Sequence, residues 1–283
     1  MITKPGVYDL PMAEYHADPC PEPSLSSSII RLLCSASPLH AWTAHPRLNA
    51  AYVAEESDRF DVGTAAHALL LEGDDTIAVI DAPDWRKKET QAARDDARAA
   101  GRTPLLIAQY ESVAVMVERA REQCGAHEDA PIPLANGRPE ETLIWQMAGT
   151  WCRARLDWLH ADGKTIDDYK TTSASANPAA WSRTIFGGGY DIQAAWYRLG
   201  VRELLDHDAA FRFVVQETEP PYALSVIGLS PDALVLAEKK ILYAFDVWRA
   251  CLKDGRWPGY PTQTCYADLP PWEEAAWLAK ELA

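Results

Sequence analysis

Two aspartates that could bind a metal ion, and a lysine, stand close together in residues 151–172. This stretch predicts two short strands joined by a tight turn at residues 160–163, where Asp and Gly favour turn formation. Successive side chains of a strand point to opposite faces, so Asp168 and Lys170 share one face of the second strand. If the strands pair across the turn, Asp157 of the first strand meets them. Two carboxylates and an ammonium group gathered in this way are typical of a divalent-metal site with a lysine beside it.

Three other side chains lie on predicted helices outside this stretch. His67 belongs to a predicted helix over residues 61–71, and a lone histidine among Ala and Leu is either a buried, hydrogen-bonded residue or a metal ligand. Gln193 and Tyr197 are four residues apart on a predicted helix over residues 191–205, so they share a face. Such a face is often an interface with a sheet.

The order of these residues resembles the PD-(D/E)XK nuclease superfamily. Its core motif would be Asp157 followed, after ten residues, by the triplet D-Y-K at residues 168–170. The segment GTAAHALLLE around His67 is similar to the helix before the sheet in RecB-like and RecE-like exonucleases, and QAAWY at residues 193–197 fits the Q-x-x-x-Y motif of the same group. The opening of the chain, with the segments YHAD and LSSS, looks like the N-terminus of RecE-type proteins of the exodeoxyribonuclease VIII kind.

The resemblance covers most of the chain and implies an α/β fold, a restriction-endonuclease-like core with a central mixed β-sheet flanked by helices. The 283 residues are expected to form a single domain of this kind. It would have a Pro-rich, irregular N-terminal arm over residues 1–24 and a core sheet over residues 139–230. The tail from Trp257 onward is rich in Pro and Trp and is expected to pack against the body.

The same resemblance implies phosphodiester hydrolysis. That reaction needs a water that is nucleophilic at neutral pH and an anionic transition state that is neutralised, and two metal ions roughly 3.5–4 Å apart can do both. The implied metal ligands are three side chains and one backbone carbonyl, those of His67, Asp157, Asp168 and Tyr169. Lys170 would position or deprotonate the water. Gln193 and Tyr197 would touch the DNA backbone beside the metal.

Mg²⁺ is the implied cofactor, and Mn²⁺ is expected to substitute because a histidine in the ligand set suits Mn²⁺ as well. Two glutamates near the motifs are further candidates. Glu72 lies five residues after His67, about 140° away on an ideal helix, which favours solvent over the metal. Glu141 is either an outer metal contact or a solvated strand end, and the pattern favours the strand end.

The balance of charge limits where DNA could bind. A formal net charge of -14 argues against general attraction to nucleic acid, so DNA-binding basic residues must concentrate along a channel. Lys87 and Lys88 belong to the densest basic run, which is either an exposed helix with internal charge pairs or a segment near the DNA path. Arg153 and Arg155 share a strand face with Asp157, and they either grip phosphate or pair with nearby carboxylates.

A predicted helix start offers another place for a phosphate. Residues 26–28 are three serines that precede an apolar stretch containing Arg31. The serines either cap the helix, or Ser28, Arg31 and the exposed N–H groups of the first turn hold a phosphate. In λ-exonuclease-like relatives a terminal 5′-phosphate is held near the active site, which supports the second alternative.

The cysteines and the apolar pattern narrow the class of protein. The six cysteines include no C-x-x-C pair, and Cys251 and Cys265 are too few and too far apart for the iron–sulfur cluster of some relatives, so no cluster is expected. No signal peptide or apolar run of membrane-spanning length is visible, which predicts a cytoplasmic protein without a membrane partner. By resemblance it would be a phage or prophage protein in a bacterial host.

These observations predict a Mg²⁺-dependent exodeoxyribonuclease that degrades linear double-stranded DNA, 5′ to 3′ by resemblance. Its relatives form homo-oligomeric rings around DNA and pass the exposed strand to a single-strand annealing recombinase. One alternative is a nuclease of this superfamily with endonuclease activity or single-strand preference. Another is a nonhydrolytic protein that binds DNA ends on the same fold.

Overall fold

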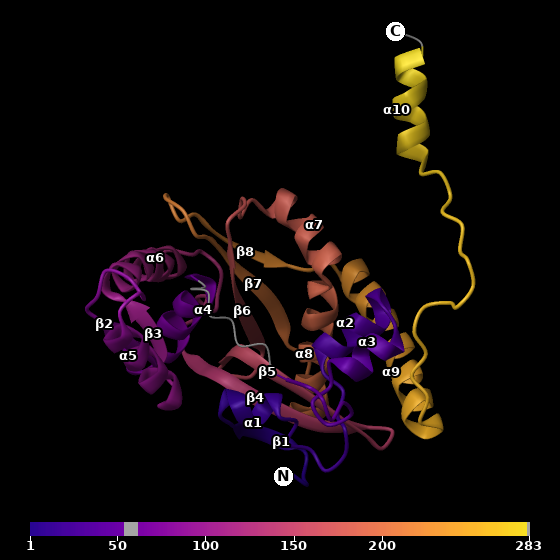
Figure 1. Ribbon diagram of the computed structural model, residues 1–283, viewed down its shortest axis with the longest axis horizontal. Coiled ribbons are helices and arrows are strands. Elements are labelled where there is room, and N and C mark those ends of the chain that lie inside the picture. Colours follow the sequence, from indigo (N-terminus) through magenta and orange to yellow (C-terminus); the bar gives the residue numbers. More distant parts are fainter. Residues whose placement is uncertain (54–61, 282–283) are drawn as a thin grey trace.

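A six-stranded β-sheet forms the centre of the protein (Figure 1). The computed structural model describes residues 1–53 and 62–281. The strand order is β1-β4-β5-β6-β7-β8, and β6 and β7 run parallel whereas the other neighbours are antiparallel. The strands are β1 Gly6–Asp9, β4 Gly137–Met147, β5 Thr150–His160, β6 Thr165–Thr172, β7 Ala210–Glu217 and β8 Leu224–Gly228. The mixed central sheet predicted from the sequence is confirmed.

Helices cover both faces of the sheet. In β7, Phe213 and Val215 belong to the larger apolar core with α2, α7, α8 and α9, whereas Val214 between them packs with α4 and α6, as the alternation of a strand requires. The helices on the larger side are α2 Ser27–Ser35, α3 Pro38–Thr43, α7 Pro178–Gly188, α8 Tyr190–Leu205 and α9 Pro231–Asp254. Those on the other side are α4 Val62–His67, the π-helix η1 Ala68–Glu72 and α6 Ile107–Gly125.

A small parallel sheet lies beside α6. It consists of β2 Ile77–Ile80 and β3 Thr103–Leu106, with the short 3-10 helix η2 Asp74–Thr76 before β2. The basic run at residues 85–102 contains the helix α5 Lys88–Ala99. This helix connects the two strands at the outer edge of the molecule (Figure 1). Lys87 and Lys88 are exposed at the beginning of this helix.

The N-terminal arm is more ordered than the Pro-rich composition predicted. Residues 6–9 form the edge strand β1, which pairs with β4, and α1 Met12–His16 follows. The YHAD segment, residues 15–18, then attaches the arm to Arg153 of β5. The Tyr15 ring lies 5.5 Å from the Arg153 guanidinium carbon, and Asp18 Oδ1 lies 3.3 Å from Arg153 Nη1. The expectation of an irregular arm was therefore wrong for this part, because backbone pairing with β4 and a buried ion pair hold it.

The predicted hairpin between β5 and β6 is confirmed, but the two strands soon separate. Ladder pairing is confined to Trp158 with Asp167 and Leu159 with Ile166. Farther from the turn, β5 no longer pairs with β6. Its backbone bonds instead to Leu25, whose N–H donates to the Trp151 carbonyl at 2.8 Å. The strands thus form a fork that opens just beyond Trp158.

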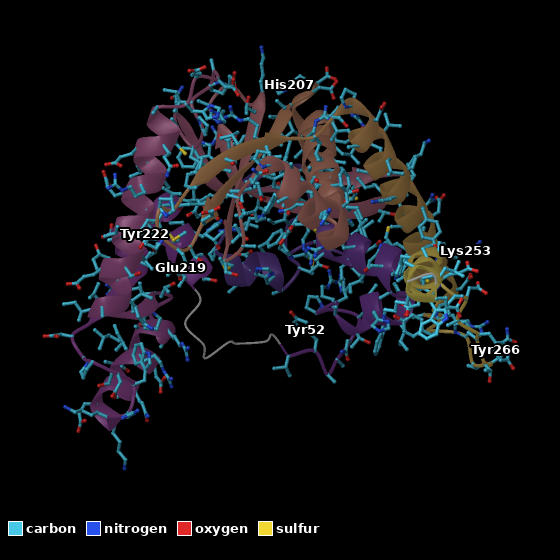
Figure 2. All side chains as sticks on the ribbon, turned by 90° about the horizontal axis from the view of Figure 1, so that it is seen from above. Tyr52, His207, Glu219, Tyr222, Lys253 and Tyr266 are labelled. Carbon is cyan, nitrogen blue, oxygen red and sulfur yellow. The ribbon has the colours of Figure 1, made fainter. Side chains whose placement is uncertain are left out.

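The C-terminal tail departs from the body. Trp257 packs against Trp248 with ring centroids 5.3 Å apart, as expected for the beginning of the tail. Farther on, Tyr266 is 91% exposed and stands at the periphery in Figure 2. The last helix, α10 Pro271–Glu281, buries none of its described residues and stands apart from the sheet and its helices in Figure 1. The expectation that the tail packs against the body is therefore wrong beyond about residue 260.

Candidate active site

Asp157 lies where the fork opens. Asp157 and Asp168 would be the next ladder pair after Trp158 and Asp167, but the strands have separated there. The Asp157 carboxylate crosses the gap instead, and its Oδ2 accepts a hydrogen bond of 2.9 Å from the backbone N–H of Tyr169. The separation of the strands thus creates the space for a site and also fixes the orientation of its first carboxylate.

Asp168 and Lys170 project from β6 toward this carboxylate. Lys170 Nζ forms an ion pair with Asp168 Oδ2 and lies 3.8 Å from Asp157 Oδ2. Asp167 points the other way, where it accepts hydrogen bonds from Arg212 at 2.7 and 2.9 Å and pairs with His160 at 2.7 Å. The structure therefore brings together the three residues that strand alternation selected, and it uses Asp167 for a buried structural network.

Gln193 and Tyr197 of α8 support Asp168 from the helix side. Gln193 Nε2 donates a hydrogen bond of 2.7 Å to Asp168 Oδ1 and another of 3.1 Å to the Tyr197 hydroxyl. Tyr197 is buried, with 7% of its surface exposed, so it holds Gln193 in place rather than lining the cleft. The two residues share a helix face as their spacing predicted, and that face reaches the site.

His67 approaches from α4 on the other side of Asp157. Its Nε2 lies 3.2 Å from Asp157 Oδ2, and its ring centroid lies 6.4 Å from that of Tyr169. The imidazole therefore joins the acidic residues rather than lying in the apolar core of its helix. The backbone of Tyr169 is held at the site by its N–H bond to Asp157, while the Tyr169 hydroxyl donates to Gln216 at 2.5 Å in the core.

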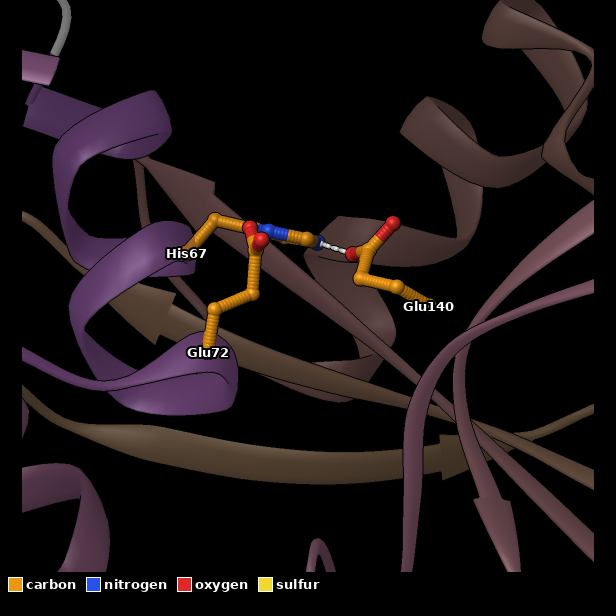
Figure 3. Close-up of side chains that lie close together, drawn as sticks. All are labelled: His67, Glu72 and Glu140. Carbon is orange, nitrogen blue, oxygen red and sulfur yellow. Dashed lines mark ion pairs between the residues drawn. The ribbon is translucent and has the colours of Figure 1, made fainter. Parts of the chain in front are cut away.

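Glu140 is a member of the site that the sequence did not reveal. Its Oε1 forms an ion pair with His67 Nε2 at 3.5 Å (Figure 3), and its other carboxylate oxygen pairs with Arg155. Glu140 has a φ of 57°, and the ladder between β4 and β5 is interrupted where it would face Asp157. This left-handed conformation is uncommon for a residue with a side chain, and the local sequence around Glu140 does not predict it. The neighbouring Glu141 pairs with Arg138.

Glu72 also comes to the site, against the expectation from ideal helix geometry. Residues 68–72 form a π-helix, in which hydrogen bonds join positions five residues apart along the chain, rather than four as in an α-helix. Glu72 therefore returns to the side of His67 instead of pointing 140° away. Ligand atoms of Glu72, His67 and Glu140 all lie within 4.8 Å of one another. Figure 3 shows the three side chains close together.

Burial and mutual repulsion set the protonation of the two aspartates. Burial and the nearby negative charge of Asp157 raise the pKa of Asp168 to about 7, although Lys170 opposes this rise. For Asp157, burial also favours the neutral form, but the charges of Lys170 and His67 outweigh it and lower the pKa. The pair therefore carries one firmly ionised carboxylate and one that holds a proton more readily.

The neighbouring carboxylates favour the protonated form of both basic groups. Burial disfavours the charged form of His67, but the carboxylates of Asp157 and Glu140 outweigh it and raise the pKa of His67 to about 9. Likewise, Asp168 and Asp157 outweigh the burial of Lys170 and raise its pKa above the ordinary value. These raised pKa values show how strongly negative the site is, and a divalent cation would displace the imidazole proton.

The site opens into a cleft of about 1330 Å³. His67, Glu72, Glu140 and Lys170 are among the residues that line it, together with Leu10 and Met12 of the N-terminal arm. Glu140 Oε1 is buried and accepts no hydrogen bond from the described residues. An orphaned buried carboxylate oxygen beside an imidazole and other carboxylates fits a divalent cation, since such ions take oxygen and imidazole ligands.

Ser28 and Arg31 line a second cavity, of about 550 Å³, together with residues 187–189. Helix α2 begins at Ser27, but the Ser26 hydroxyl bonds to that of Ser28 at 3.0 Å and makes no capping bond. The Tyr190 ring lies near both Arg31 of this cavity and Lys170 of the active site. Its centroid lies 5.5 Å from the Arg31 guanidinium carbon and 5.8 Å from Lys170 Nζ.

The remaining basic candidates are placed differently. Arg153 is buried, and its Nη1 donates to the Ser24 carbonyl at 3.0 Å as well as pairing with Asp18. Arg155 pairs with Glu140 and donates to the Leu10 carbonyl at 2.5 Å. The structure thus favours ion pairs with buried carboxylates, rather than phosphate binding, as the role of both arginines. Lys87 and Lys88 are exposed and are not among the residues that line the cleft.

The comparisons with known proteins bear on the family and the fold. The family model described as "PDDEXK-like domain of unknown function (DUF3799)" matches residues 26–269. The chain belongs to this family. It is therefore a member of the PD-(D/E)XK group. In the comparison with curated protein sequences, no match was found.

The fold of this PDDEXK-like domain is also seen in a solved structure. The crystal structure of a protein from Eubacterium rectale, named "Putative exonuclease", is similar with a TM-score of 0.59. The two chains are 13% identical, and the match covers 95% of this chain and 99% of the other. At this identity the likeness shows the fold alone.

Among the described residues, no helix is both long enough and apolar enough to cross a membrane.

Proposed function

We propose that this protein is a metal-dependent exodeoxyribonuclease that degrades linear double-stranded DNA. The convergence of Asp157, Asp168 and Lys170 at the fork between β5 and β6 carries the proposal. In metal-dependent phosphodiester hydrolysis, ionised carboxylates hold the divalent cations, and a cationic group near the phosphate offsets its charge. The membership of the chain in a PDDEXK-like family supports a nuclease of this mechanism.

The side chains divide the chemical work as follows. Asp157, Asp168 and the backbone carbonyl of Tyr169 would hold Mg²⁺ or Mn²⁺, and His67 would complete the ligand set. A cation bound there would supply Lewis-acid stabilisation and an activated water. Lys170, with Nζ between the two aspartates, would orient that water and offset charge on the phosphate. Gln193 holds Asp168 in its ligating orientation through their 2.7 Å hydrogen bond.

An exonuclease must also recognise a DNA end. The cavity lined by Ser28 and Arg31 supports this role, because Arg31 and the active-site Lys170 both lie near the Tyr190 ring, at 5.5 and 5.8 Å from its centroid. A terminal 5′-phosphate could be held there by the Arg31 guanidinium and the first turn of α2. This placement favours 5′ to 3′ degradation. The resemblance to RecE-type and λ-exonuclease-like proteins further supports a homo-oligomeric ring and a single-strand annealing recombinase as partner.

The test is the digestion of linear and nicked-circular duplex DNA with Mg²⁺, with Mn²⁺ and with EDTA. We expect the linear duplex to be shortened from its ends, and we expect EDTA to stop the reaction. Asp168→Ala and Lys170→Ala should each lower the rate by at least about a thousandfold, since each removes several kcal/mol of transition-state stabilisation. Unchanged cleavage by these variants, or intact linear DNA with wild-type protein, would contradict the proposal.

The polarity is tested separately by comparing 5′-phosphate with 5′-hydroxyl ends. If Arg31 holds the phosphate, wild-type protein should degrade the phosphorylated duplex faster, and Arg31→Ala should abolish the difference. Arg183→Ala, on the neighbouring helix α7 and absent from the residues that line either cavity, is the matched control. Equal rates on both ends with wild-type protein would remove the phosphate site from the proposal.

A further inference from the structure

The cavity beside α2 is larger and more apolar than a phosphate group requires. It has a volume of about 550 Å³ and lies between α2, the end of α7 and the beginning of α8. Sites of about 300–1,000 Å³ usually hold ligands through an apolar wall and a few fixed polar groups. Ser28 and Arg31 supply polar groups here, whereas Leu32, Phe186 and Ile192 supply apolar ones. This lining suits a ligand that joins an anionic group to an apolar ring.

Arg31 is available to bind an anion in this cavity. Within the described parts of the chain no carboxylate pairs with Arg31, whereas Lys240, which also lines the cavity, is paired with Asp191 at 2.6 Å. The stem of Arg31 rests on Gly189, where a Cβ would lie 3.0 Å from Arg31 Cγ and where φ is 68°. Glycine meets both of these demands, so the loop lets the arginine side chain lie along the cavity wall.

Phe186 provides an aromatic surface in the same cavity. It is 45% exposed near the end of α7, and its ring contacts no other aromatic ring or cation among the described residues. Single exposed apolar residues are common and need no explanation by themselves. Phe186, however, lines a cavity that also contains an arginine without a carboxylate partner. Nucleobases of any sequence stack on free aromatic rings, and a neighbouring arginine can hold the phosphate.

The position of the cavity relates its ligand to the active site. The Tyr190 ring centroid lies 5.5 Å from the Arg31 guanidinium carbon and 5.8 Å from Lys170 Nζ. A strand whose terminal phosphate is held by Arg31 therefore ends close to the active site. The cavity has room for one nucleotide rather than for a base pair with its two backbones, so a base must be unpaired to enter it.

We propose that this cavity is a nucleotide site, which binds the 5′-terminal nucleotide of a DNA strand in an unpaired state, with its phosphate on Arg31 and its base stacked on Phe186. This inference rests on the proposed function, and it deepens that function by naming the form of the DNA end that the protein binds. The preferred substrate is a duplex whose 5′-terminal nucleotide overhangs or is mismatched. A fully paired end has to open first, which costs the pairing and stacking of its terminal base.

The test measures binding to a hairpin duplex whose open end carries one overhanging, 5′-phosphorylated nucleotide. Fluorescence anisotropy gives the affinity with Ca²⁺ in place of Mg²⁺, because Ca²⁺ also binds carboxylate oxygens. Wild-type protein should bind an overhanging adenine about 5- to 150-fold more tightly than an abasic overhang, the range for one base stacked on an aromatic ring. Phe186→Ala should bind both ends with the lower affinity, and Phe186→Trp should keep the preference. Tyr243→Ala, which removes another exposed aromatic ring that lines neither cavity, is the matched control and should also keep it.

Phe186 lies outside the buried core, so its variants should fold, and an unchanged thermal midpoint checks this. Equal affinity of wild-type protein for the adenine and abasic ends, or a preference that survives in Phe186→Ala, would overturn the nucleotide site. Failure to bind either end would overturn it as well. A preference that depends on Phe186, in a protein that leaves linear DNA intact with Mg²⁺ and Mn²⁺, would contradict the proposed nuclease and uphold the nucleotide site. Degradation of linear DNA without this preference would do the reverse.

Discussion

Asp168 is held from two directions by residues of different character. Lys170 pairs with one carboxylate oxygen, and Gln193 donates to the other at 2.7 Å. The side chain is fully buried, so these two contacts replace the water that an exposed carboxylate would have. Its geometry is therefore fixed before any cation or DNA arrives, which is what a ligand needs.

Gln193→Ala should reduce cleavage about 10- to 100-fold, because loss of a group that orients a metal ligand usually has this effect on affinity or activity. The Mn²⁺ concentration that gives half-maximal cleavage should rise as well. Tyr197→Phe keeps the bond between Gln193 and Asp168, so its effect should be smaller. Rates measured over a range of Mn²⁺ concentrations would check this, and equal losses in the two variants would contradict it.

Asp18 illustrates a buried charge that acts on stability. Burial opposes its ionisation, but His45, Arg153 and Ser24 outweigh burial and lower the pKa of Asp18 to about 2. The unfolded chain takes up its proton near pH 3.9. The stabilisation is therefore fully present above about pH 4, and it is lost as the pH falls through about 2.

Asp18→Asn should lower the free energy of unfolding at pH 7 by about 3–5 kcal/mol, since it leaves Arg153 buried without its charge partner. About 2 kcal/mol of the wild-type stability should disappear between pH 4 and pH 2, and this slope should be absent in the variant. Urea unfolding at several pH values measures both. Glu22→Gln, an exposed residue of the same arm, is the control and should change stability by less than about 0.5 kcal/mol. A parallel pH dependence in Asp18→Asn would show that another group is responsible.

At the scale of elements, the support that Asp168 receives from α8 depends on how closely this helix packs on the sheet. Gly200 of α8 faces β4, and a Cβ there would lie 2.9 Å from the Trp145 ring and 3.1 Å from Leu143 Cδ1. A larger residue would push α8 away from the sheet. Because α8 also carries Gln193, this contact helps to set the distance from which Asp168 is held.

Gly200→Ala should therefore destabilise the protein by about 1–3 kcal/mol, because the overpacking exceeds the roughly 1 kcal/mol by which alanine favours a helix. Gly187 of α7 is the matched control, since a Cβ there meets nothing within 4 Å. Gly187→Ala should be neutral or stabilising by up to about 1 kcal/mol. Chemical denaturation compares the two directly. A stabilising Gly200→Ala would show that α8 moves away freely.

At the scale of the whole molecule, the body ends before the chain does. The family match stops at residue 269, and α10 follows at residues 271–281. Trp272 and Trp277 are 73% and 61% exposed on this helix. Residues with so little buried surface contribute little to the free energy of folding.

Removing residues 264–283 should leave the thermal midpoint within about 2 °C of the wild-type value, since the described part of α10 buries no residue. The initial rate of DNA degradation should also be unchanged if the site is complete within the body. Differential scanning calorimetry and the duplex assay measure these quantities. A midpoint lowered by 5 °C or more would show that the tail packs on the body in solution.

The sequence by itself determined the fold class and the central part of the site. Strand alternation selected Asp168 over Asp167 as the partner of Lys170, and helix spacing placed Gln193 and Tyr197 on one face. These inferences succeeded because side-chain direction in regular strands and helices depends only on position along the chain. The order of the motifs then indicated the superfamily, which the family model confirms.

Only the tertiary structure revealed Glu140 and Glu72, because both depend on departures from regular geometry. Glu140 needs a left-handed φ at a break in the ladder, and Glu72 needs a π-helix. Arg153 and Arg155 likewise found buried carboxylate partners that lie far away in the sequence or on another strand. Irregular backbone and long-range ion pairs depend on the packing of the whole chain, which local sequence patterns do not predict.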